Sequence, residues 1–411
     1  MKPADYYDIV IVGGGLAGAS LARALAGGLA RVAVIEPHPP GDPGQPGFDD
    51  RALALAFGTA RILNNLGVWS RLGEERCAIE TIHVSEQGRL GFTRLRAGEE
   101  GVEALGYVVP ARALGQALLH RIDRLAGIDW LSPARLRAFE THATHVRLEI
   151  QHGDAARTLE TSLLVGADGG DSFIRKQLAL PTRRAAYRQH AIVCNLLTSQ
   201  PHRHIAYERF TGNGPMALLP MSGEHRHALV WSVNDALRDE LARQGNDAFA
   251  AAAQAAFGLR AGRFQQVGER TVYPLEMLRA LRSTAPRAVL IGNAAHTLHP
   301  IAGQGFNLGI RDVAVLADLL SDTLAAGGDP GDATLLDRYE AWRHRDQKWV
   351  ARATDSLVRL FDTPFPPLRA ARGLGLTLLD NCPPAKHWLA RGAMGLAGRL
   401  PRLALKEAAH E

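Results

Sequence analysis

Cysteine is scarce in this 411-residue chain, which has only Cys77, Cys194 and Cys382, far apart from one another. The count is odd and no Cys-x-x-Cys pair occurs, so the sequence excludes a disulfide framework and a zinc ribbon. We expect three free thiols, as in a protein of a reducing cytosol. The chain also lacks a His-x-x-x-His helix with a nearby acid and a Gly-x-Ser-x-Gly nucleophile elbow. We therefore predict no metal site and no serine nucleophile.

Long apolar runs are missing too, and none is long enough to span a bilayer. We expect no cleaved signal peptide, because the first predicted strand starts at Asp8 and must be retained. Internal repeats and low-complexity tracts do not occur. With 46% hydrophobic and 22% charged residues, the sequence is typical of a globular protein with a large core and two domains rather than three.

The net charge is +5, but almost all of the positive charge is arginine spread along the chain. Clustered basic residues with interleaved aromatics are absent, so we predict no nucleic-acid partner. Residues 368–405 differ, because basic side chains there punctuate leucine-, alanine- and glycine-rich stretches. The segment is consistent with a helical cap on the rest of the chain, and equally with a surface that rests on an anionic membrane or docks to a partner enzyme. Its basic residues are Arg369, Arg372, Lys386, Arg391, Arg399 and Arg402.

A glycine-rich turn follows the first apolar strand, which covers residues 8–12. The turn carries Gly13, Gly15 and Gly18 in the spacing Gly-x-Gly-x-x-Gly, and a helical run comes next. In such a turn the first glycine permits the bend, the second lets the backbone meet a pyrophosphate, and the third packs helix on strand. The pattern predicts a dinucleotide site, and the alternative is a glycine-rich turn without a nucleotide.

An acidic residue, Glu36, closes the second predicted strand, residues 31–35. A carboxylate there is placed to accept hydrogen bonds from the 2′- and 3′-hydroxyls of an adenosine ribose. It also disfavours a 2′-phosphate, so the pattern favours FAD or NAD over NADP at this first site.

The most informative stretch is residues 287–312, where a short strand runs into Gly292 and Asn293. A tight Gly303-Gln304-Gly305 turn follows, and a helical pattern starts at Asn307. Small residues let the backbone approach a flat ring, and the helix directs its N-terminal N–H groups at whatever lies above the turn. A reduced flavin, negative at its N1/C2 edge, suits that position. Taken alone, the stretch is also compatible with a strand–turn–helix joint without a ligand.

A third joint of this kind lies in the middle of the chain. An apolar strand leads into Asp168-Gly169-x-x-Ser172-x-x-Arg175 and then into a helix. Ser172 or Asp171 can cap that helix, which is the simpler interpretation. Three strand-to-glycine-turn joints in one chain nevertheless favour a common ligand.

With these three motifs in this order, the chain resembles the FAD-dependent aromatic-ring monooxygenases of the para-hydroxybenzoate hydroxylase type. Within that family it is most similar to the ubiquinone-biosynthesis ring hydroxylases, in particular the 2-polyprenyl-6-methoxyphenol hydroxylase branch. The branch similarity rests on residues 47–55, 208–210, 214–221 and 354–358. The wider family motifs match at Gly13, Gly15, Gly18, Glu36, Asp168, Gly169, Ser172, Arg175, Gly292, Pro300, Gly303, Gly305, Asn307 and Asp312.

The resemblance implies an α/β fold with two domains, a Rossmann-like FAD-binding domain and a β-sheet substrate domain, together with C-terminal helices. The FAD-binding domain is expected to be discontinuous and to cover residues 1–78, 107–182 and 272–330. The substrate domain is expected over 79–106 and 183–271, and the helical region over 331–411. Side chains at 204–210, 217–220 and 228–233 alternate with period two, which agrees with strands of a sheet. Residues 247–257 have a helical pattern, and we expect them to form a helix across that sheet.

The family's functional residues carry over onto the matching positions of this sequence. The resemblance implies a catalytic set of Pro300, Gly303, Gln304 and Gly305. It implies a cofactor-binding set of Gly13, Gly15, Gly18, Glu36, Arg51, Arg112, Gln116, Asp168, Gly169, Arg175, Gly292, Asn293, Gly303, Gly305 and Asn307. For Arg51, Arg112 and Gln116 the alternative is a solvated or intrahelical pair. Asn293 departs from the aspartate of the wider family but keeps an acceptor oxygen for a ribitol hydroxyl.

The activity implied is hydroxylation of a polyprenylated phenol, with FAD as cofactor, NAD(P)H as electron donor and O2 as co-substrate, through a flavin C4a-hydroperoxide. His296 and His299 are interpreted as structural. We expect a cytoplasmic protein, with contact to the inner face of the plasma membrane or to other ubiquinone-biosynthesis enzymes left open. The alternatives are another ring position or aromatic substrate, a flavin oxidoreductase that does not insert oxygen, and a non-catalytic FAD-bound scaffold.

Overall fold

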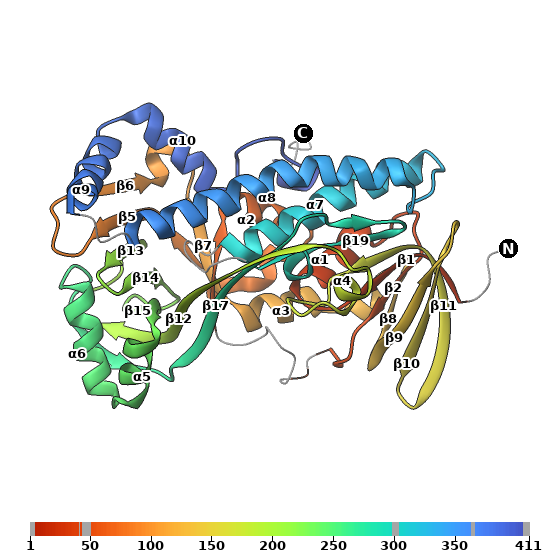
Figure 1. The fold of residues 1–411 in the computed structure, drawn as a ribbon, viewed down its shortest axis with the longest axis horizontal. Coiled ribbons are helices and arrows are strands. Elements are labelled where there is room, and N and C mark those ends of the chain that lie inside the picture. The colour runs from red at the N-terminus through yellow and green to blue at the C-terminus, as the bar shows by residue number, and fades with distance from the viewer. Residues whose placement is uncertain (1–4, 41, 43–50, 298–303, 363–365, 406–411) are drawn as a thin grey trace.

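A computed structural model describes residues 5–40, 42, 51–297, 304–362 and 366–405, and gives the backbone alone for 186–188, 304, 349–362 and 366–372. An eight-stranded sheet lies toward one end of the molecule and a nine-stranded sheet toward the other, with the long helix α8 (Ala333–Asp362) extending between them (Figure 1). The predicted α/β architecture with two sheet layers and C-terminal helices is confirmed.

The eight-stranded sheet has the order β18-β19-β11-β1-β2-β8, with the β9–β10 hairpin added beside β11. Its central strands pair in parallel and are buried on both faces, which explains why they read as continuous apolar runs. Its strands are β1 (Tyr6–Val12), β2 (Val32–Ile35), β8 (Ile128–Leu131), β9 (Ala134–Thr141), β10 (Val146–His152), β11 (Ala155–Gly166), β18 (Thr284–Ala285) and β19 (Ala288–Leu290).

Helices α1 (Leu16–Leu25), α3 (Ala111–Leu119) and α7 (Gln304–Ala325) cover one face of this sheet. Ile9 and Ile11 of β1 face that helical layer, whereas Val10 and Val12 pack against β10 and the short helix α4 (Phe173–Gln177). Both faces of β1 are therefore core, and the turn that follows it is held in place from two sides.

The nine-stranded sheet has the order β20-β17-β12-β15-β14-β13-β5-β6, with β16 paired to β12. The strands expected at 204–210, 217–220 and 228–233 are β13, β14 and β15. The helix expected at 247–257 is α6 (Asn246–Phe257), which covers one face together with α5 (Asp235–Arg243). The strands are β5 (Thr81–Glu86), β6 (Phe92–Arg96), β12 (Thr182–Thr198), β13 (Ile205–Thr211), β14 (Gly214–Pro220), β15 (Arg226–Asn234), β16 (Phe264–Val267), β17 (Thr271–Ala280) and β20 (His296–Thr297).

A three-stranded sheet, β3 (Ala52–Ala56), β7 (Gly106–Pro110) and β4 (Cys77–Ile79), joins the two larger layers. Val108 of β7 and Ile79 of β4 pack against Ala206 and Ala228 of the nine-stranded sheet, on the face that α6 does not cover. Helix α2 (Phe57–Asn65) continues directly from β3. The short connecting helices are η1 (Trp69–Glu75), η2 (Ala97–Glu100), η3 (Ile122–Arg124) and η4 (Gly292–Ala294).

The C-terminal part is helical, with α9 (Pro366–Asp380), α10 (Pro383–Ala393) and η6 (Arg402–Ala404) after α8. Cys77 and Cys194 are buried and Cys382 is exposed, and all three are free thiols as predicted. Among the described helices, none combines the length and hydropathy needed to cross a membrane. The division into domains stays a prediction; β20 and all but the first residue of β17 lie within residues 272–330 and pair in the nine-stranded sheet.

Candidate active site

Four of the predicted residues lie at one edge of the eight-stranded sheet. Gly13 and Glu36 directly follow β1 and β2, while Asp168 and Gly292 come two residues after β11 and β19. These strands are neighbours in the order β19-β11-β1-β2 and pair in parallel, so their carboxyl ends meet at the same edge. The three sequence motifs are therefore brought together by the sheet.

In the first glycine turn, two of the three glycines are closely packed and the third has space at its Cβ position. A Cβ added to Gly13 would lie 2.4 Å from the Ala167 carbonyl oxygen, and one added to Gly18 would lie 1.8 Å from the Gly13 carbonyl oxygen. Internal packing therefore requires these two glycines. A Cβ on Gly15 would meet no heavy atom within 4 Å. Because Gly15 sits at the N-terminus of α1, an anion can approach the backbone there.

Glu36 is buried, with 4% of its surface exposed, and it holds this turn against β2. Its Oε2 accepts a hydrogen bond from the Gly14 N–H at 2.6 Å, and its Oε1 accepts one from the His38 N–H at 2.9 Å. A carboxylate offers about four acceptor positions. Two of them remain for the hydroxyls of a ribose.

One of the two oxygens of the Asp168 carboxylate has a hydrogen-bond partner among the described residues. Its Oδ2 accepts a hydrogen bond from the Ile174 N–H at 3.1 Å, whereas its buried Oδ1 has no partner in the described part of the chain. Gly169 follows, with no heavy atom near its Cβ position. Ser172 caps α4, because its Oγ accepts from the Arg175 N–H at 3.0 Å. A buried acceptor without a donor indicates that a ligand hydroxyl completes the site.

Arg175, which the family motif assigns to cofactor binding, lies between two loops. It is 2% exposed, and its Nη1 and Nη2 donate at 2.7 Å to the carbonyl oxygens of Ala294 and Gly170, respectively. Both of these guanidinium nitrogens therefore bind backbone. Arg175 therefore connects the loop that contains Asp168 to η4.

A buried ionic network lies behind Gly292. Asp312 of α7 is completely buried; its Oδ2 accepts from the Gly292 N–H at 3.1 Å and lies 2.6 Å from His296 Nε2. Its Oδ1 accepts from Arg343 Nε at 2.7 Å and from Gln347 Nε2 at 3.1 Å. Both partners come from α8. The network therefore couples the turn after β19 to a helix that sequence analysis did not connect with the site.

Charges within this network hold Asp312 in its ionised form. Burial alone would raise the pKa of Asp312, but His296 and Arg343 outweigh it and lower that pKa to about 2. Burial also disfavours the charge on Arg343, yet Asp312 and Asp346 raise the pKa of its guanidinium overall. His296 is completely buried and faces this carboxylate, so it is not presented to a substrate.

The start of α7 is tied to β3. Asn307 is 5% exposed; its Oδ1 accepts from the Ala56 N–H and the Thr59 hydroxyl, both at 2.8 Å, and its Nδ2 donates to the Ala54 carbonyl oxygen at 2.9 Å. Gly305, two residues earlier, has no heavy atom near its Cβ position. The Asn307 side chain therefore holds the N-terminal end of α7 against β3.

The remaining predicted residues are dispersed. Asn293 is exposed on η4, and Gln116 is exposed on α3. Arg112 Nη2 lies 3.0 Å from Glu75 Oε1, in a half-exposed ion pair. The backbone of Gln304 begins α7. Pro300 and Gly303 of the predicted catalytic set, together with His299, lie outside the described residues.

Arg51, which directly precedes β3, contacts the nine-stranded sheet. Its guanidinium lies 5.0 Å from the centre of the Tyr273 ring on β17. Tyr273 is opposite Ala191 of β12, two residues before Val193, so Tyr273 and Val193 belong to the same face of the sheet. That face is the one without α6.

A row of half-buried side chains crosses the same face. Val84, Glu208, Ala217, Val230 and Val193 lie opposite one another on the adjacent strands β5, β13, β14, β15 and β12. All five keep part of their surface accessible although they lie within the sheet. On the opposite face the neighbouring residues are buried beneath α6; they are Ile192, Cys194, Met216, Leu218, Leu229 and Trp231. The accessible row is thus an apolar surface with one carboxylate.

Glu208 is that carboxylate. No hydrogen bond or ion pair from any described residue reaches it. Burial raises the pKa of Glu208 to about 7. The resemblance included this residue only as part of a sequence signature. Its position became visible once the register of β5, β13 and β14 was known.

One cluster of metal-ligand types also forms, from Cys77, His202 and His204. Cys77 Sγ lies 3.9 Å from His202 Nε2 and 3.8 Å from His204 Nδ1. However, His202 Nδ1 accepts from the His204 N–H at 3.0 Å, and its Nε2 lies 3.1 Å from the Met221 carbonyl oxygen. Both nitrogens of His202 are therefore occupied by backbone groups, and a neutral ring has no lone pair left for a metal.

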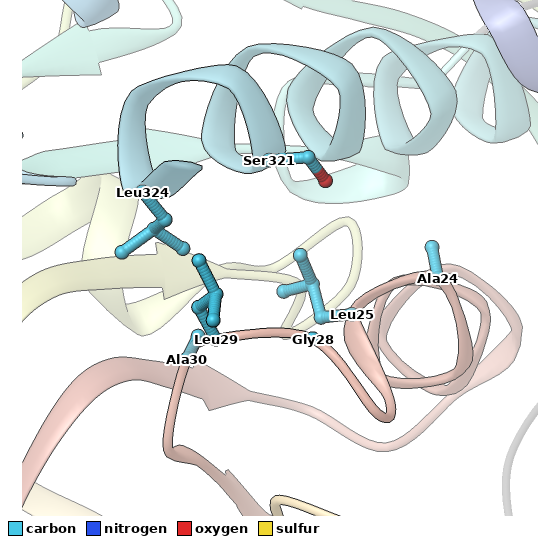
Figure 2. Close-up of a pocket in the computed structure, with 7 residues that line it drawn as sticks. All are labelled: Ala24, Leu25, Gly28, Leu29, Ala30, Ser321 and Leu324. Atoms are coloured by element: carbon cyan, nitrogen blue, oxygen red, sulfur yellow. The ribbon is translucent and has the colours of Figure 1, made fainter. Parts of the chain in front are cut away.

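A small pocket lies at the other end of α1, away from Gly15 (Figure 2). It has no titratable side chain and offers no chemistry of its own. Its lining is Ala24, Leu25, Gly28, Leu29, Ala30, Ser321 and Leu324.

Comparison with known proteins decides the family. The model for the FAD binding domain family matches residues 6–354. Ubiquinone hydroxylase UbiL of Rhodospirillum rubrum is 39% identical over 399 residues, covering 96% of this chain and 92% of the relative. The chain is an FAD-dependent monooxygenase of this family. The 3-demethoxyubiquinol 3-hydroxylase of Escherichia coli is 30% identical, covering 95% of this chain and 98% of the relative.

The fold of this FAD-dependent monooxygenase is similar to that of a solved structure. p-Nitrophenol 4-monooxygenase PnpA of Pseudomonas putida superposes with a TM-score of 0.80, covering 96% of this chain and 99% of that one, at 16% identity. The residues present also fit FAD. The open backbone at Gly15 suits a pyrophosphate, the spare acceptor positions of Glu36 suit a ribose, and the unpartnered Oδ1 of Asp168 suits a further hydroxyl.

Proposed function

We propose that this monooxygenase hydroxylates the aromatic ring of a polyprenylated phenol, of the 2-polyprenyl-6-methoxyphenol type, in ubiquinone biosynthesis. NAD(P)H is the electron donor and O2 the co-substrate. The activities for which the UbiL and Escherichia coli relatives are named support this substrate class. The structural observation that carries the proposal is the accessible row on β5, β13, β14, β15 and β12, an apolar surface with the single carboxylate of Glu208.

Glu208 supplies the acid–base function in this proposal. A phenol becomes more nucleophilic at its ring carbons as its hydroxyl proton is withdrawn. The Glu208 carboxylate has no competing partner among the described residues, and burial raises its pKa to about 7, which is suited to accepting a proton near neutral pH. It therefore binds the substrate hydroxyl and takes its proton.

The apolar members of the row perform a second task. Val84, Ala217, Val230 and Val193 offer no hydrogen-bonding side chains, so they bind the ring and the start of a prenyl tail while excluding water. Bound FAD supplies the redox chemistry that activates O2. The N-terminus of α7 would stabilise negative charge on the flavin, because the first N–H groups of a helix lack intrahelical acceptors and the positive end of the helix dipole lies there.

Location and partners form part of the same proposal. The three free thiols support a cytoplasmic enzyme, because disulfides are disfavoured in that compartment. A substrate with a polyprenyl tail partitions into a bilayer, so the enzyme has to meet it at the membrane surface.

Deletion of the gene tests the proposed substrate. Quinones extracted from the deletion strain are identified by mass spectrometry. The proposal predicts loss of ubiquinone and accumulation of a polyprenyl-methoxyphenol-type intermediate, whose structure also identifies the ring position. Normal ubiquinone would assign the enzyme to another aromatic substrate. Purified enzyme that reduces a substrate without oxygen insertion would favour a non-oxygenating oxidoreductase, and failure of NADH and NADPH to reduce bound FAD would favour a scaffold.

A further inference from the structure

Two charged side chains of α9 and α10, Asp380 and Lys386, face the rest of the protein. Asp380 at the end of α9 accepts a hydrogen bond from the Arg94 N–H at 2.8 Å and one from the Thr93 hydroxyl at 3.3 Å. Lys386 of α10 is 9% exposed, and its Nζ lies 2.8 Å from Glu99 Oε2 and 3.7 Å from Asp380 Oδ1. These contacts fix the polar side of the helix pair onto β6 and η2.

The same helices expose their large apolar groups. Leu374 and Leu378 are 67% and 69% exposed and lie four residues apart, on one face of α9. Trp388 of α10 is 63% exposed, and Arg391, three residues later, is exposed on the same side of its helix. We define these four residues as the α9–α10 face. A surface helix normally has the reverse pattern, with apolar residues inward and charges outward.

The charge of this segment favours one kind of partner. Residues 366–405 contain six basic residues and one acid, Asp380, and thus carry a net charge of +5, equal to the net charge of the whole chain. The acid is engaged toward β6, and two of the basic residues are paired within the protein, Lys386 with Glu99 and Arg402 with Asp318 and Asp322, which leaves four. Exposed leucine and tryptophan beside an exposed arginine, in a segment with an excess of basic residues, are typical of helices that lie in the interface of an anionic bilayer.

We propose that the α9–α10 face rests on an anionic membrane surface. Leu374, Leu378 and Trp388 enter the headgroup region, and the exposed Arg391 attracts acidic lipid headgroups.

The position of the face fits the substrate of the proposed function, on which this part of the inference rests. Helix α9 packs on β6 and β5, and Val84 of β5 lies opposite Glu208 of β13. Figure 1 shows α9 and α10 at the same end of the molecule as β5, β6 and β13. A prenyl tail in the bilayer is thereby close to the accessible row that receives the ring.

Vesicle sedimentation with the FAD-loaded full chain tests the proposal. We expect binding to vesicles of phosphatidylcholine mixed with phosphatidylglycerol, weaker binding to phosphatidylcholine alone, and a decrease with added salt. The variant with Leu374→Ser, Leu378→Ser and Trp388→Ser should bind at least about tenfold more weakly, because the buried apolar area is lost. The matched control carries Leu29→Ser and Leu259→Ser, which alter residues 74% and 65% exposed elsewhere on the surface, and should bind like the wild type.

Two outcomes would overturn the proposal. One is a wild-type chain that stays in the supernatant with both kinds of vesicle, which would assign the face to a protein partner. The other is equal binding by the triple variant and the control. Hydroxylation of a phenol without a tail separates this test from the proposed function. The triple variant should retain that activity and lose activity on a polyprenylated phenol embedded in vesicles, whereas vesicle binding without any hydroxylation would contradict only the proposed function.

Discussion

Arg343 of α8 donates a hydrogen bond to Asp312 of α7 at 2.7 Å, and both side chains are almost completely buried. The Asp312 carboxylate in turn accepts from the Gly292 N–H in the turn after β19. A charged pair thus connects α8 to the backbone of the turn after β19. Removing one partner would leave the other as an uncompensated buried charge, which is costly.

The variant Arg343→Met should therefore lower the free energy of unfolding by about 3–5 kcal/mol, measured by urea denaturation. The matched control is Arg238→Met, whose partner Asp239 lies 2.7 Å away in an exposed pair. That change should cost less than about 1 kcal/mol. Equal losses in the two variants would show that the buried network does not stabilise the fold.

Substitutions at Gly15 and Gly18 should have different effects on FAD affinity and on the free energy of unfolding. Valine at Gly15 has room on the protein side, so the unfolding free energy of the apoprotein should change by less than about 0.5 kcal/mol. The side chain would occupy the approach to the backbone, and FAD affinity, measured by flavin fluorescence, should fall by at least about tenfold. In contrast, Gly18→Ala forces a Cβ against the Gly13 carbonyl and should destabilise the apoprotein by about 1–3 kcal/mol. FAD binding by Gly15→Val with unchanged affinity would contradict the assignment.

Glu208 should set the pH dependence of the reaction. Its carboxyl must be ionised to accept the phenol proton, and its pKa is raised to about 7 by burial, so kcat/KM should increase with pH and level off above about 7. In Glu208→Gln this rise should disappear and kcat should fall by about 10²–10⁴-fold, while KM changes little because the amide is isosteric. A variant that keeps the wild-type pH profile would exclude Glu208 as the base.

The same carboxyl should make stability depend on pH. Because the pKa of Glu208 is higher in the folded chain, about 7, than its ordinary value of 4.5, the folded state binds more protons between these values. Wild-type stability relative to Glu208→Gln is therefore greatest below pH 4.5 and is lost as the pH rises to 7, by roughly 2 kcal/mol. Thermal unfolding of both proteins across this range measures the difference. A constant difference would mean that Glu208 ionises normally in the folded chain.

The edge of the eight-stranded sheet where the three glycine motifs meet could largely be predicted from sequence, because its sequence signals are local. Gly13, Gly15, Gly18 and Glu36 lie beside the strands that position them, and the order of glycine turns does not depend on distant contacts. Glycine spacing reports directly on backbone geometry. The strands, the fold class and the family were accordingly predicted.

Roles that depend on distant partners could not be predicted in the same way. Asn307 lies in a family motif, but its side chain binds β3, about 250 residues earlier in the chain. Arg175 likewise binds the carbonyl of Ala294, which is 119 residues away. Glu208 faces the accessible row only because β13 pairs with β5 in parallel, a long-range pairing that the period-two pattern leaves open. The exposed leucines of α9 were also hidden in the sequence, since only packing decides which helical face is covered.

Oxygen transfer to a phenol ring is the central claim, and a single-enzyme assay with 18O2 tests it most directly. The purified chain is loaded with FAD and supplied with NADH or NADPH and a polyprenylated methoxyphenol in vesicles, and the products are analysed by mass spectrometry. We expect one 18O atom in each product ring. Oxidation of the nicotinamide with hydrogen peroxide as the sole oxygen product, or a product without 18O, would contradict it.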